Sequence, residues 1–300
     1  MFMRLARGGF SCIGCSWIRN MSLRAGRRGI GSCGTGNFRQ RRYWSMQIRV
    51  LGASGSEEPG YRSPAFLVDD FLLMDAGTVS LSLESEEQCR ITHIFLTHAH
   101  LDHIKGIPFL VDNIVSSGQG CRLSILSGKD VIADLKRNIF NNRIWPDFST
   151  IPDAENPVMR YREISTRGRI QVGDYSIYAT RVNHAVPTYG YMIENRSSTA
   201  LVYTGDTGPT ERIWKRMRGH RVSALIAEVS FPDELEELAL ASGHLTPSLL
   251  ETEITKMPVI PQTIYITHLK PFHKATIKKQ LARIRKTRIE ILRDGMVITV

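Results

Sequence analysis

The segment Thr97-His98-Ala99-His100-Leu101-Asp102-His103 constrains this chain more than any other part of its sequence. It follows an apolar stretch, 91–96, that predicts a buried strand, so its side chains can point outward from a strand end. In an extended segment residues i and i+2 point the same way, so His98 and His100 can hold one ion. Asp102 and His103 follow at a predicted helix start and can hold a second ion nearby. Imidazole and carboxylate ligands suit zinc, manganese or iron.

Three further residues of metal-ligand type stand at the ends of predicted strands. His184 follows the strand 175–182, Asp206 follows 200–203 and His268 follows 263–267. Taken alone, each of these residues could equally have a structural role in the turn after its strand and not bind a metal. Their shared placement matters more, because strand ends form the site in α/β proteins. The sequence therefore predicts that all three join the first motif in one metal site.

The periodicity of the body predicts α/β layers around one continuous core. Apolar residues alternate or run in short stretches in the first half, and strands alternate with helical patterns in the second half. We expect strands at 47–51, 65–68, 71–74, 91–96, 122–126, 175–182, 190–193, 200–203, 224–228, 263–267 and 296–300. We expect helices at 104–117, 129–139, 209–217, 233–241, 247–256 and 273–286. Asp69-Asp70 predicts a tight hairpin turn.

The first 45 residues account for most of the net charge of +10. They hold nine arginines and no lysine or acid, which leaves 30 basic residues against 29 acids in the body, 46–300. We predict a disordered extension at 1–45, either a mitochondrial transit peptide or translated sequence upstream of a true start at Met46. The many glycines favour the second interpretation. A near-neutral body does not favour a nucleic-acid partner.

The cysteines predict a chain without a disulfide framework. Three of the five lie in the first 33 residues, which leaves only Cys89 and Cys121 in the body. We therefore expect a reducing compartment and a cytoplasmic location, or a mitochondrial one if 1–45 is a transit peptide. No stretch approaches the roughly 20 apolar residues that a membrane-spanning helix needs.

The combined motif resembles the metallo-β-lactamase superfamily. The resemblance covers 46–300 and includes Asp75-Ala76-Gly77, which is similar to that superfamily's early Asp-Gly motif. It implies a four-layer αββα sandwich with two metal ions at one edge. Asp75 would support the metal loop, and Asp206 would bridge the two ions. The remaining implied ligands are His98, His100 and His184 for one ion, and Asp102, His103 and His268 for the other.

A narrower resemblance points to class II 3′,5′-cyclic-nucleotide phosphodiesterases. It rests on the blocks THAHLDHIKGIPFLVDN (97–113), FNNRIWPDF (140–148), NHAVPTYGY (183–191), YTGDTGP (203–209), SGHLTP (242–247) and ITHLKP (266–271). The resemblance implies hydrolysis of cAMP or cGMP to the 5′-monophosphate, assisted by two divalent ions. Zinc is favoured, with manganese or iron as alternatives.

Three residues are predicted to serve the reaction itself. Asp102 belongs to the metal loop, and His244 is a candidate proton donor to the leaving oxygen. Glu228 could orient His244, a pairing that resembles the Glu and His of ribonuclease Z. The alternative is that His244 only caps the helix expected from Pro247. His93 and His220 are assigned no role.

The aromatic and amide side chains of the loop 141–152 are candidates for substrate binding. Asn141, Asn142, Trp145 and Phe148 could form a wall against the base, because aromatic rings stack on bases and amides read their edges. The alternative, packing within the loop and against the core, is equally compatible with the sequence.

Three functions remain open from the sequence. The first is a phosphodiesterase acting on a small cyclic nucleotide, with a homodimer left open. The second is a ribonuclease Z-like endoribonuclease that processes tRNA 3′ ends. The third is a metal-binding protein without catalysis, which the full ligand set disfavours. The near-neutral body favours the small substrate over RNA.

Overall fold

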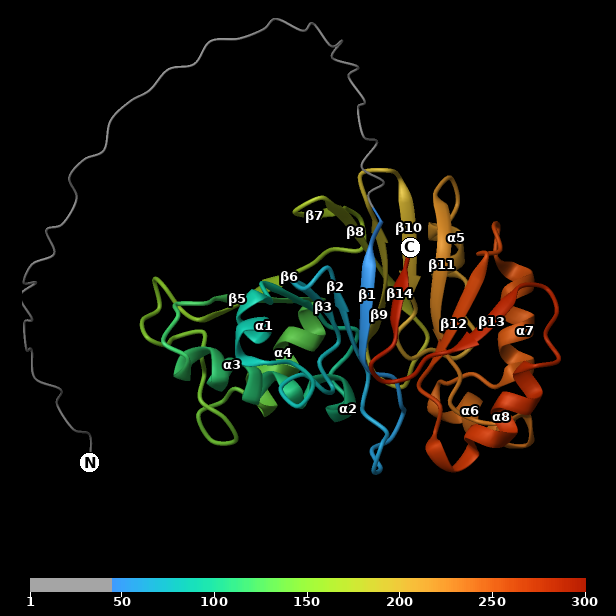
Figure 1. The fold of residues 1–300 in the computed structure, drawn as a ribbon, viewed down its shortest axis with the longest axis horizontal. Helices are drawn as coiled ribbons and strands as arrows, with labels where there is room; N and C mark the ends of the chain where they lie inside the picture. Colours follow the sequence, from blue (N-terminus) through green and yellow to red (C-terminus); the bar gives the residue numbers. More distant parts are fainter. Residues whose placement is uncertain (1–44) are drawn as a thin grey trace, which may run out of the picture. The chain divides into compact units, whose positions relative to one another are not determined.

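The structure is a computed structural model that describes residues 45–300. The predicted extension, apart from Ser45, lies outside the described residues, as do Cys12, Cys15 and Cys33. Within 45–300 the chain forms two seven-stranded sheets with helices beside them (Figure 1).

The first sheet has the order β14-β1-β2-β3-β4-β5-β6. Its strands are β1 (Gln47–Gly52), β2 (Ala65–Val68), β3 (Leu72–Met74), β4 (His93–Phe95), β5 (Leu123–Ser127), β6 (Met159–Glu163) and β14 (Val297–Thr299). The second sheet has the order β13-β12-β11-β10-β9-β8-β7. Its strands are β7 (Ile170–Val172), β8 (Tyr175–Val182), β9 (Thr188–Glu194), β10 (Thr199–Tyr203), β11 (Arg221–Glu228), β12 (Thr263–Thr267) and β13 (Arg288–Ile291).

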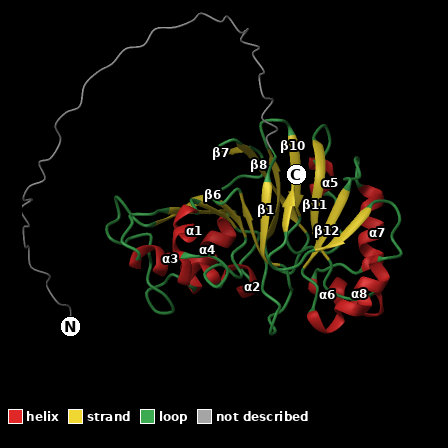
Figure 2. Ribbon diagram, viewed as in Figure 1, coloured by secondary structure: helices red, strands yellow, loops and turns green. Residues whose placement is uncertain are grey.

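The helices form the two outer layers, as the colouring by secondary structure shows (Figure 2). Beside the first sheet lie α1 (Ser85–Arg90), α2 (Leu101–Ile104), α3 (Gly106–Ser116) and α4 (Lys129–Asn138). Beside the second lie α5 (Arg212–Arg216), α6 (Glu236–Ser242), α7 (Pro247–Lys256) and α8 (Lys274–Leu281), with 3-10 turns at Asp233–Leu235 and Pro271–His273. The predicted four-layer αββα sandwich is confirmed.

Alternation along the strands divides the apolar side chains between two cores. In β10, Leu201 and Tyr203 belong to the core that also holds the first sheet's residues. Ala200 and Val202 point the other way, into a second core that includes Trp214 of α5. This is the period-2 pattern of a sheet covered on both faces. The second sheet is therefore apolar on both sides, which explains its long apolar runs.

The strand directions bring the ligand-bearing loops to one edge. Strands β3, β4 and β5 are parallel, and so are β10, β11, β12 and β13. Strand β8 is antiparallel to β9, which is antiparallel to β10, so β8 and β10 run the same way. Parallel strands end at the same edge of a sheet. Each predicted metal motif follows the end of one of these strands.

Most predicted elements are present, and the exceptions are short or lie at sheet edges. Asp69 and Asp70 both have positive φ, at 44° and 62°, as the tight hairpin requires. The elements α1, β6, β7 and β13 were not predicted. Strands β6, β7 and β13 lie at or near the ends of their sheets and expose many polar side chains, so no apolar pattern marks them. The predicted helix 209–217 begins later, at Arg212.

The expectation of a body without a disulfide is wrong. Cys89 in α1 is bonded to Cys121, which precedes β5, across 32 positions of sequence. The count of two cysteines gave no information on their distance in space, and the fold brings them together. No helix among residues 45–300 is both long enough and apolar enough to cross a membrane.

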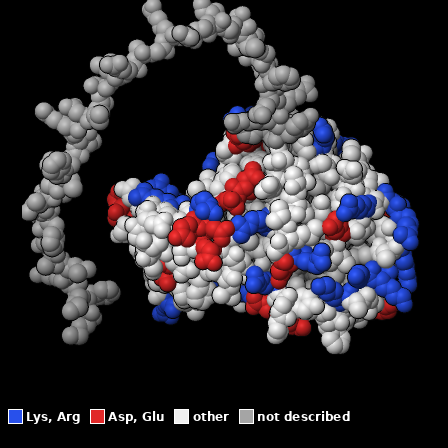
Figure 3. All heavy atoms as spheres, in the orientation of Figure 1, with Lys and Arg blue, Asp and Glu red and all other residues white. Residues whose placement is uncertain are grey.

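The near-neutral net charge of the body conceals an uneven distribution. Residues 256–293 hold ten lysines and arginines and one acid, and 212–227 hold five and none. Figure 3 shows the basic side chains gathered over the α7, α8 and β13 side of the molecule, and acidic ones over α1. The sequence average therefore understates the positive potential on the second half of the fold.

Candidate metal centre

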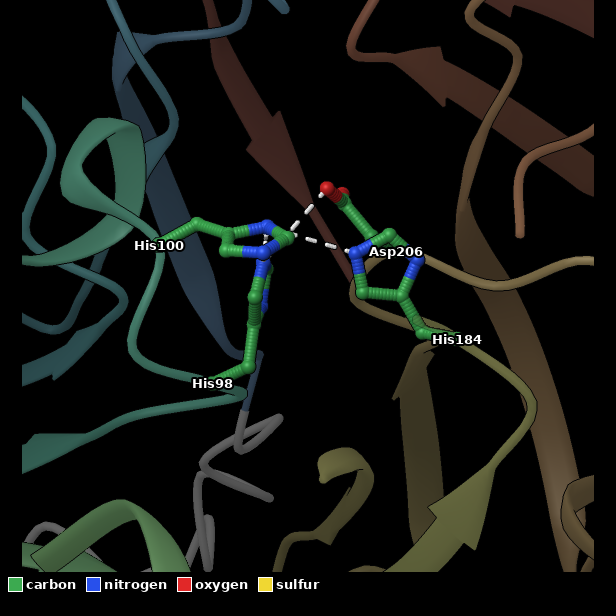
Figure 4. A group of neighbouring side chains, drawn as sticks. All are labelled: His98, His100, His184 and Asp206. Atoms are coloured by element: carbon green, nitrogen blue, oxygen red, sulfur yellow. Dashed lines mark hydrogen bonds and ion pairs between the residues drawn. The ribbon is translucent and has the colours of Figure 1, made fainter. Parts of the chain in front are cut away.

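Four side chains from three strand ends converge at the edge between the sheets (Figure 4). His98 and His100 follow β4, His184 follows β8 and Asp206 follows β10. The Nε2 atom of His98 lies 3.0 Å from Nδ1 of His100, which lies 3.3 Å from Nε2 of His184. One carboxylate oxygen of Asp206, Oδ2, is 3.7 Å from Nε2 of His98. These are the residues predicted to hold the first ion, with the predicted bridge beside them.

A second group adjoins the first through Asp206. Asp102, His103 and His268 each offer one atom within 4.8 Å of the others. The Nε2 atom of His268 lies 3.2 Å from Oδ2 of Asp102 and 3.2 Å from Oδ2 of Asp206. The same Asp206 oxygen is 3.3 Å from Nε2 of His103. Asp206 Oδ2 therefore touches both groups, as a bridging ligand must.

Asp75 organises the first half of the site. Its carboxylate accepts hydrogen bonds from Nδ1 of His103 at 2.7 Å and from the hydroxyl of Tyr203 at 2.7 Å. It also accepts from the backbone N–H of Thr97 at 2.8 Å and from the Thr97 hydroxyl at 2.9 Å. Because that hydroxyl donates to Asp75, it accepts from Nδ1 of His98, 2.9 Å away. One buried carboxylate thus orients two histidines, one directly and one through a hydroxyl.

Glu228 organises the second half in the same way. Its carboxylate accepts from Nδ1 of His244 at 2.8 Å and from the hydroxyl of Ser230 at 2.9 Å. The Ser230 hydroxyl oxygen lies 2.8 Å from Nδ1 of His268 and accepts a hydrogen bond from it. Glu228 and Ser230 are completely buried, so these hydrogen bonds are shielded from water. The backbone N–H of Thr207 also donates to Glu228, at 3.2 Å.

The hydrogen bonds at Nδ1 leave the other ring nitrogens as lone pairs that face one another. His184 donates from Nδ1 to the carbonyl of Gly243 at 2.8 Å, so Nε2 of its neutral ring is an acceptor, as it is in the neutral rings of His98 and His103. The Nε2 atom of His103 is buried without a hydrogen-bond partner. Ring nitrogens that converge in this way beside two carboxylates form a ligand set suited to a divalent cation. The residues present therefore fit a metal centre.

The carboxylates of the cluster are ionised. Burial would raise the pKa of Asp206, but His268 and His103 beside it hold that pKa well below its ordinary value. The pKa of Asp102 is lowered in spite of burial by the hydrogen bond from His268. Burial lowers the pKa of His98 well below its ordinary value. Burial opposes the charge of His103 too, but Asp206 and Asp75 outweigh it and raise its pKa well above the ordinary value, so a metal ion bound at its Nε2 would replace a proton there.

Two glycines permit the close approach of the loops that carry the ligands. A Cβ on Gly77 would lie 1.9 Å from the backbone oxygen of Asp102, so only glycine lets these segments touch. Gly205 has φ +60° and would place a Cβ 2.8 Å from the Thr97 side chain. The Asp-Ala-Gly and Gly-Asp motifs therefore combine a functional carboxylate with the glycine that its position requires.

His244 lies next to the metal centre and pairs with Glu228 as predicted from the sequence. Burial opposes its charge, but the Glu228 carboxylate outweighs burial and raises the pKa of His244 above its ordinary value. Its ring centroid is 4.9 Å from that of His184 and 5.4 Å from that of His268. The helix beginning at Pro247 is capped by the side chain of Thr246, which accepts from the N–H of Leu249. His244 is therefore not needed as that cap.

The predicted substrate-binding side chains make contacts within their own loop and the core. The side-chain Oδ1 of Asn141 accepts from the backbone N–H groups of Arg143 and Ile144, and Oδ1 of Asn142 accepts from the backbone N–H of Asp147. Trp145 packs at 5.3 Å against Phe109, and Phe148 is buried in the core. These contacts support the packing alternative. A role of Asn141, Asn142, Trp145 and Phe148 in binding substrate stays a prediction.

Three residues of the site were missed by sequence reasoning: Thr97, Tyr203 and Ser230. Each contributes a hydroxyl group that contacts Asp75 or Glu228. Thr97 directly precedes His98, and Ser230 stands two positions after Glu228, so both could have been proposed as neighbours of functional residues. Tyr203 gave no such signal, because a tyrosine in a buried strand is explained by packing alone.

A family model described as a β-lactamase superfamily domain matches residues 72–269, which include all seven predicted ligands. The chain belongs to the metallo-β-lactamase superfamily. It is a hydrolase of that fold, and membership implies divalent metal ions at the His/Asp cluster. The predicted superfamily is thereby confirmed.

Similar proteins include both cyclic-nucleotide phosphodiesterases and ribonucleases Z. The chain is 24% identical over 277 residues to a probable 3′,5′-cyclic-nucleotide phosphodiesterase of Yersinia pestis, covering 76% of this chain and 79% of the relative. It is 24% identical over 257 residues to a ribonuclease Z of Archaeoglobus fulgidus, covering 67% and 80%. The crystal structure of unliganded yeast PDE1 has the same fold, with a TM-score of 0.75, 17% identity, and coverage of 85% of this chain and 99% of that one.

Proposed function

We propose that this protein hydrolyses 3′,5′-cyclic nucleotides to 5′-monophosphates at a centre of two divalent ions. The observation that carries the proposal is the pair of adjoining ligand groups joined by Asp206, with the His244–Glu228 pair beside them. The substrate class is supported by the family-like sequence blocks and by relatives named cyclic-nucleotide phosphodiesterases.

The proposed ligand roles follow the two groups of side chains. His98, His100 and His184 would hold one ion, Asp102, His103 and His268 the other, and Asp206 both. Divalent ions at such a centre supply positive charge for the phosphodiester and lower the pKa of water. The imidazole and carboxylate donors favour zinc, with manganese or iron as alternatives.

His244 is proposed to donate a proton to the 3′-oxygen as it leaves phosphorus. An alkoxide is a poor leaving group, so a positioned acid accelerates its departure. Glu228 holds Nδ1 of His244 at 2.8 Å, which leaves Nε2 as the atom that could face the substrate. The carboxylate also raises the pKa of His244, so the protonated form persists to higher pH than in free histidine.

The second candidate is a ribonuclease Z-like endoribonuclease that processes tRNA 3′ ends. It is favoured by a relative named ribonuclease Z that has the same 24% identity, and by the lysines and arginines gathered on the second half of the fold. A catalytically silent metal-binding protein is disfavoured, because the complete ligand set and the His244–Glu228 pair are both present.

The test is a hydrolysis panel with 3′,5′-cAMP, 3′,5′-cGMP, 2′,3′-cAMP, bis-p-nitrophenyl phosphate and a precursor tRNA. We expect turnover of the 3′,5′-cyclic nucleotides, its loss on chelation, and an intact precursor tRNA. Trimming of the tRNA 3′ end without cyclic-nucleotide turnover would replace this proposal by the second candidate. No turnover of any substrate by metal-loaded protein would favour the silent alternative.

Location and assembly also stay predictions. A cytoplasmic location was expected from the cysteine count, but the Cys89–Cys121 bond counts against a reducing compartment. A homodimer is compatible with the proposed function and is not required by it, since all seven proposed ligands come from one chain.

A further inference from the structure

A cavity whose lining includes no proposed metal ligand is lined almost entirely by basic side chains. Its volume is about 470 Å³, which is within the usual range for small-ligand sites. The lining residues are Thr166, Thr180, Arg181, Arg212, Lys215, Arg216, Arg218 and His220. No acidic residue is among them.

Three arginines of this cavity carry charge that no carboxylate neutralises. Arg212 and Arg218 are exposed, and their guanidinium groups have no hydrogen-bond or ion-pair partner within residues 45–300. Arg216 donates to the backbone oxygen of Thr166 at 2.9 Å and lies 5.9 Å from the centroid of the Tyr178 ring, but it contacts no acid. A cluster of three uncompensated guanidinium groups repels itself and is relieved by an anion.

The other three basic side chains of the cavity each have one acidic partner. Arg181 pairs with Asp130 at 3.1 Å, and Lys215 pairs with Glu211 at 2.8 Å on an exposed surface. His220 lies 3.2 Å from Glu194. Ion pairs exposed to water are weak, so these side chains can turn toward a more strongly charged ligand at small cost.

The chain provides this charge from three separate segments. Lys215 and two of the arginines lie on or at the start of α5, Arg218 and His220 on the turn that follows, and Arg181 on β8. Arg216 fixes the β6–β7 loop against the helix, and that loop carries Arg167 and Arg169 next to Thr166. Guanidinium groups bind phosphate oxygens through paired hydrogen bonds, so arginine is suited to this chemistry.

We propose that this cavity is a binding site for a small anion that carries two or three linked phosphate groups, for which ATP is the probe. Three guanidinium groups without a carboxylate partner match the two or three linked phosphate groups of such a ligand better than the single group of a monophosphate. The volume suits one small molecule. This site goes beyond the proposed hydrolysis, which takes place at other residues.

The test is calorimetric titration of the metal-loaded full chain with magnesium-saturated ATP. Arg212→Ala/Arg218→Ala removes two charges that make no contact, so its fold should be unchanged. Arg283→Ala/Arg285→Ala, which removes two exposed arginines after α8, is the matched control. Because hydrogen bonds to charged groups contribute about 1.5–3 kcal/mol each, we expect Kd for ATP to rise at least about 10-fold in the first variant and to stay unchanged in the control.

AMP and a 12-nucleotide single-stranded RNA complete the experiment. We expect AMP to bind more weakly than ATP and the RNA to show no dependence on Arg212 and Arg218. A different result would be that the wild-type protein binds the RNA but not ATP, and that Arg212→Ala/Arg218→Ala no longer binds the RNA. That result would replace this proposal by a nucleic-acid-binding surface. Absent ATP binding, or equal ATP binding in both variants, would overturn it. Hydrolysis of bis-p-nitrophenyl phosphate without ATP should be equal in all three proteins, so a failure here is distinct from a failure of the proposed hydrolase.

Discussion

The two halves of the metal centre are built on the same plan from different parts of the chain. In the first half Asp75 orients His103 directly and His98 through the Thr97 hydroxyl. In the second half Glu228 orients His244 directly and His268 through the Ser230 hydroxyl.

The difference lies in what each carboxylate controls. Asp75 holds two proposed ligands, whereas Glu228 holds one proposed ligand and the proposed proton donor. The first half should therefore govern metal binding, and the second half should govern both metal binding and proton transfer.

Among the histidines that Asp75 and Glu228 orient, only His244 is not a proposed ligand, and its replacement should have the largest effect on kcat. His244→Ala should lower kcat by about 10²–10⁴-fold on a 3′,5′-cyclic nucleotide, because it removes a positioned acid. Metal content should be unchanged. The kcat for bis-p-nitrophenyl phosphate should fall less, because its leaving group needs less protonation.

His93→Ala is the matched control for that variant, since His93 stands at the start of β4, the end of the strand away from the metal motif. Equal losses of activity on the two substrates would show that His244 binds phosphate and does not act as an acid. Loss of a metal ion from His244→Ala would make it a ligand, which its distance from Asp206 and His268 allows.

Replacing each carboxylate should separate the two halves. Asp75→Asn should weaken metal binding by about 10–100-fold, because two ligands lose the acceptor that orients them. Compared with Asp75→Asn, Glu228→Gln should retain more metal, and its kcat at saturating metal should fall further below the wild-type value. Metal titration followed by activity measures both quantities. If Glu228→Gln lost more metal than Asp75→Asn, the division of roles between the halves would be wrong.

Removing the two relay hydroxyls should give the smallest effects. Ser230→Ala and Thr97→Val each take away the acceptor for one histidine and leave the carboxylate in place. We expect about a 10-fold loss of metal affinity in each, the lower end of the range for groups that orient ligands. Competition with a chromophoric chelator measures the affinity. An unchanged affinity in both variants would show that the direct contacts alone position the site.

The sequence predicted the ligands that stand close together in the chain more directly than the ligands that stand far apart. His98, His100, Asp102 and His103 stand within six positions of one another, so their spacing alone indicates a metal site. His184, Asp206 and His268 are far apart, and only their shared position after strands connected them. The parallel strand directions that unite them are a property of the whole sheet, which local periodicity does not give.

What escaped prediction has identifiable physical reasons. The edge strands β6, β7 and β13 lack an apolar pattern because they are partly exposed. Cys89 and Cys121 meet only because of how α1 packs near the segment before β5. The basic cavity was hidden by averaging, since acids elsewhere cancel its charge in the total for the body.

Asp206 is the residue at which the two halves meet, so its replacement tests the account most directly. Its Oδ2 lies 3.7 Å from Nε2 of His98, 3.3 Å from that of His103 and 3.2 Å from that of His268. The decisive measurement is the metal content of purified wild-type protein and Asp206→Asn by plasma mass spectrometry. We predict two divalent ions per wild-type chain and a loss of both sites in the variant, together with its activity. Two ions and full activity in Asp206→Asn would contradict a centre bridged by this carboxylate.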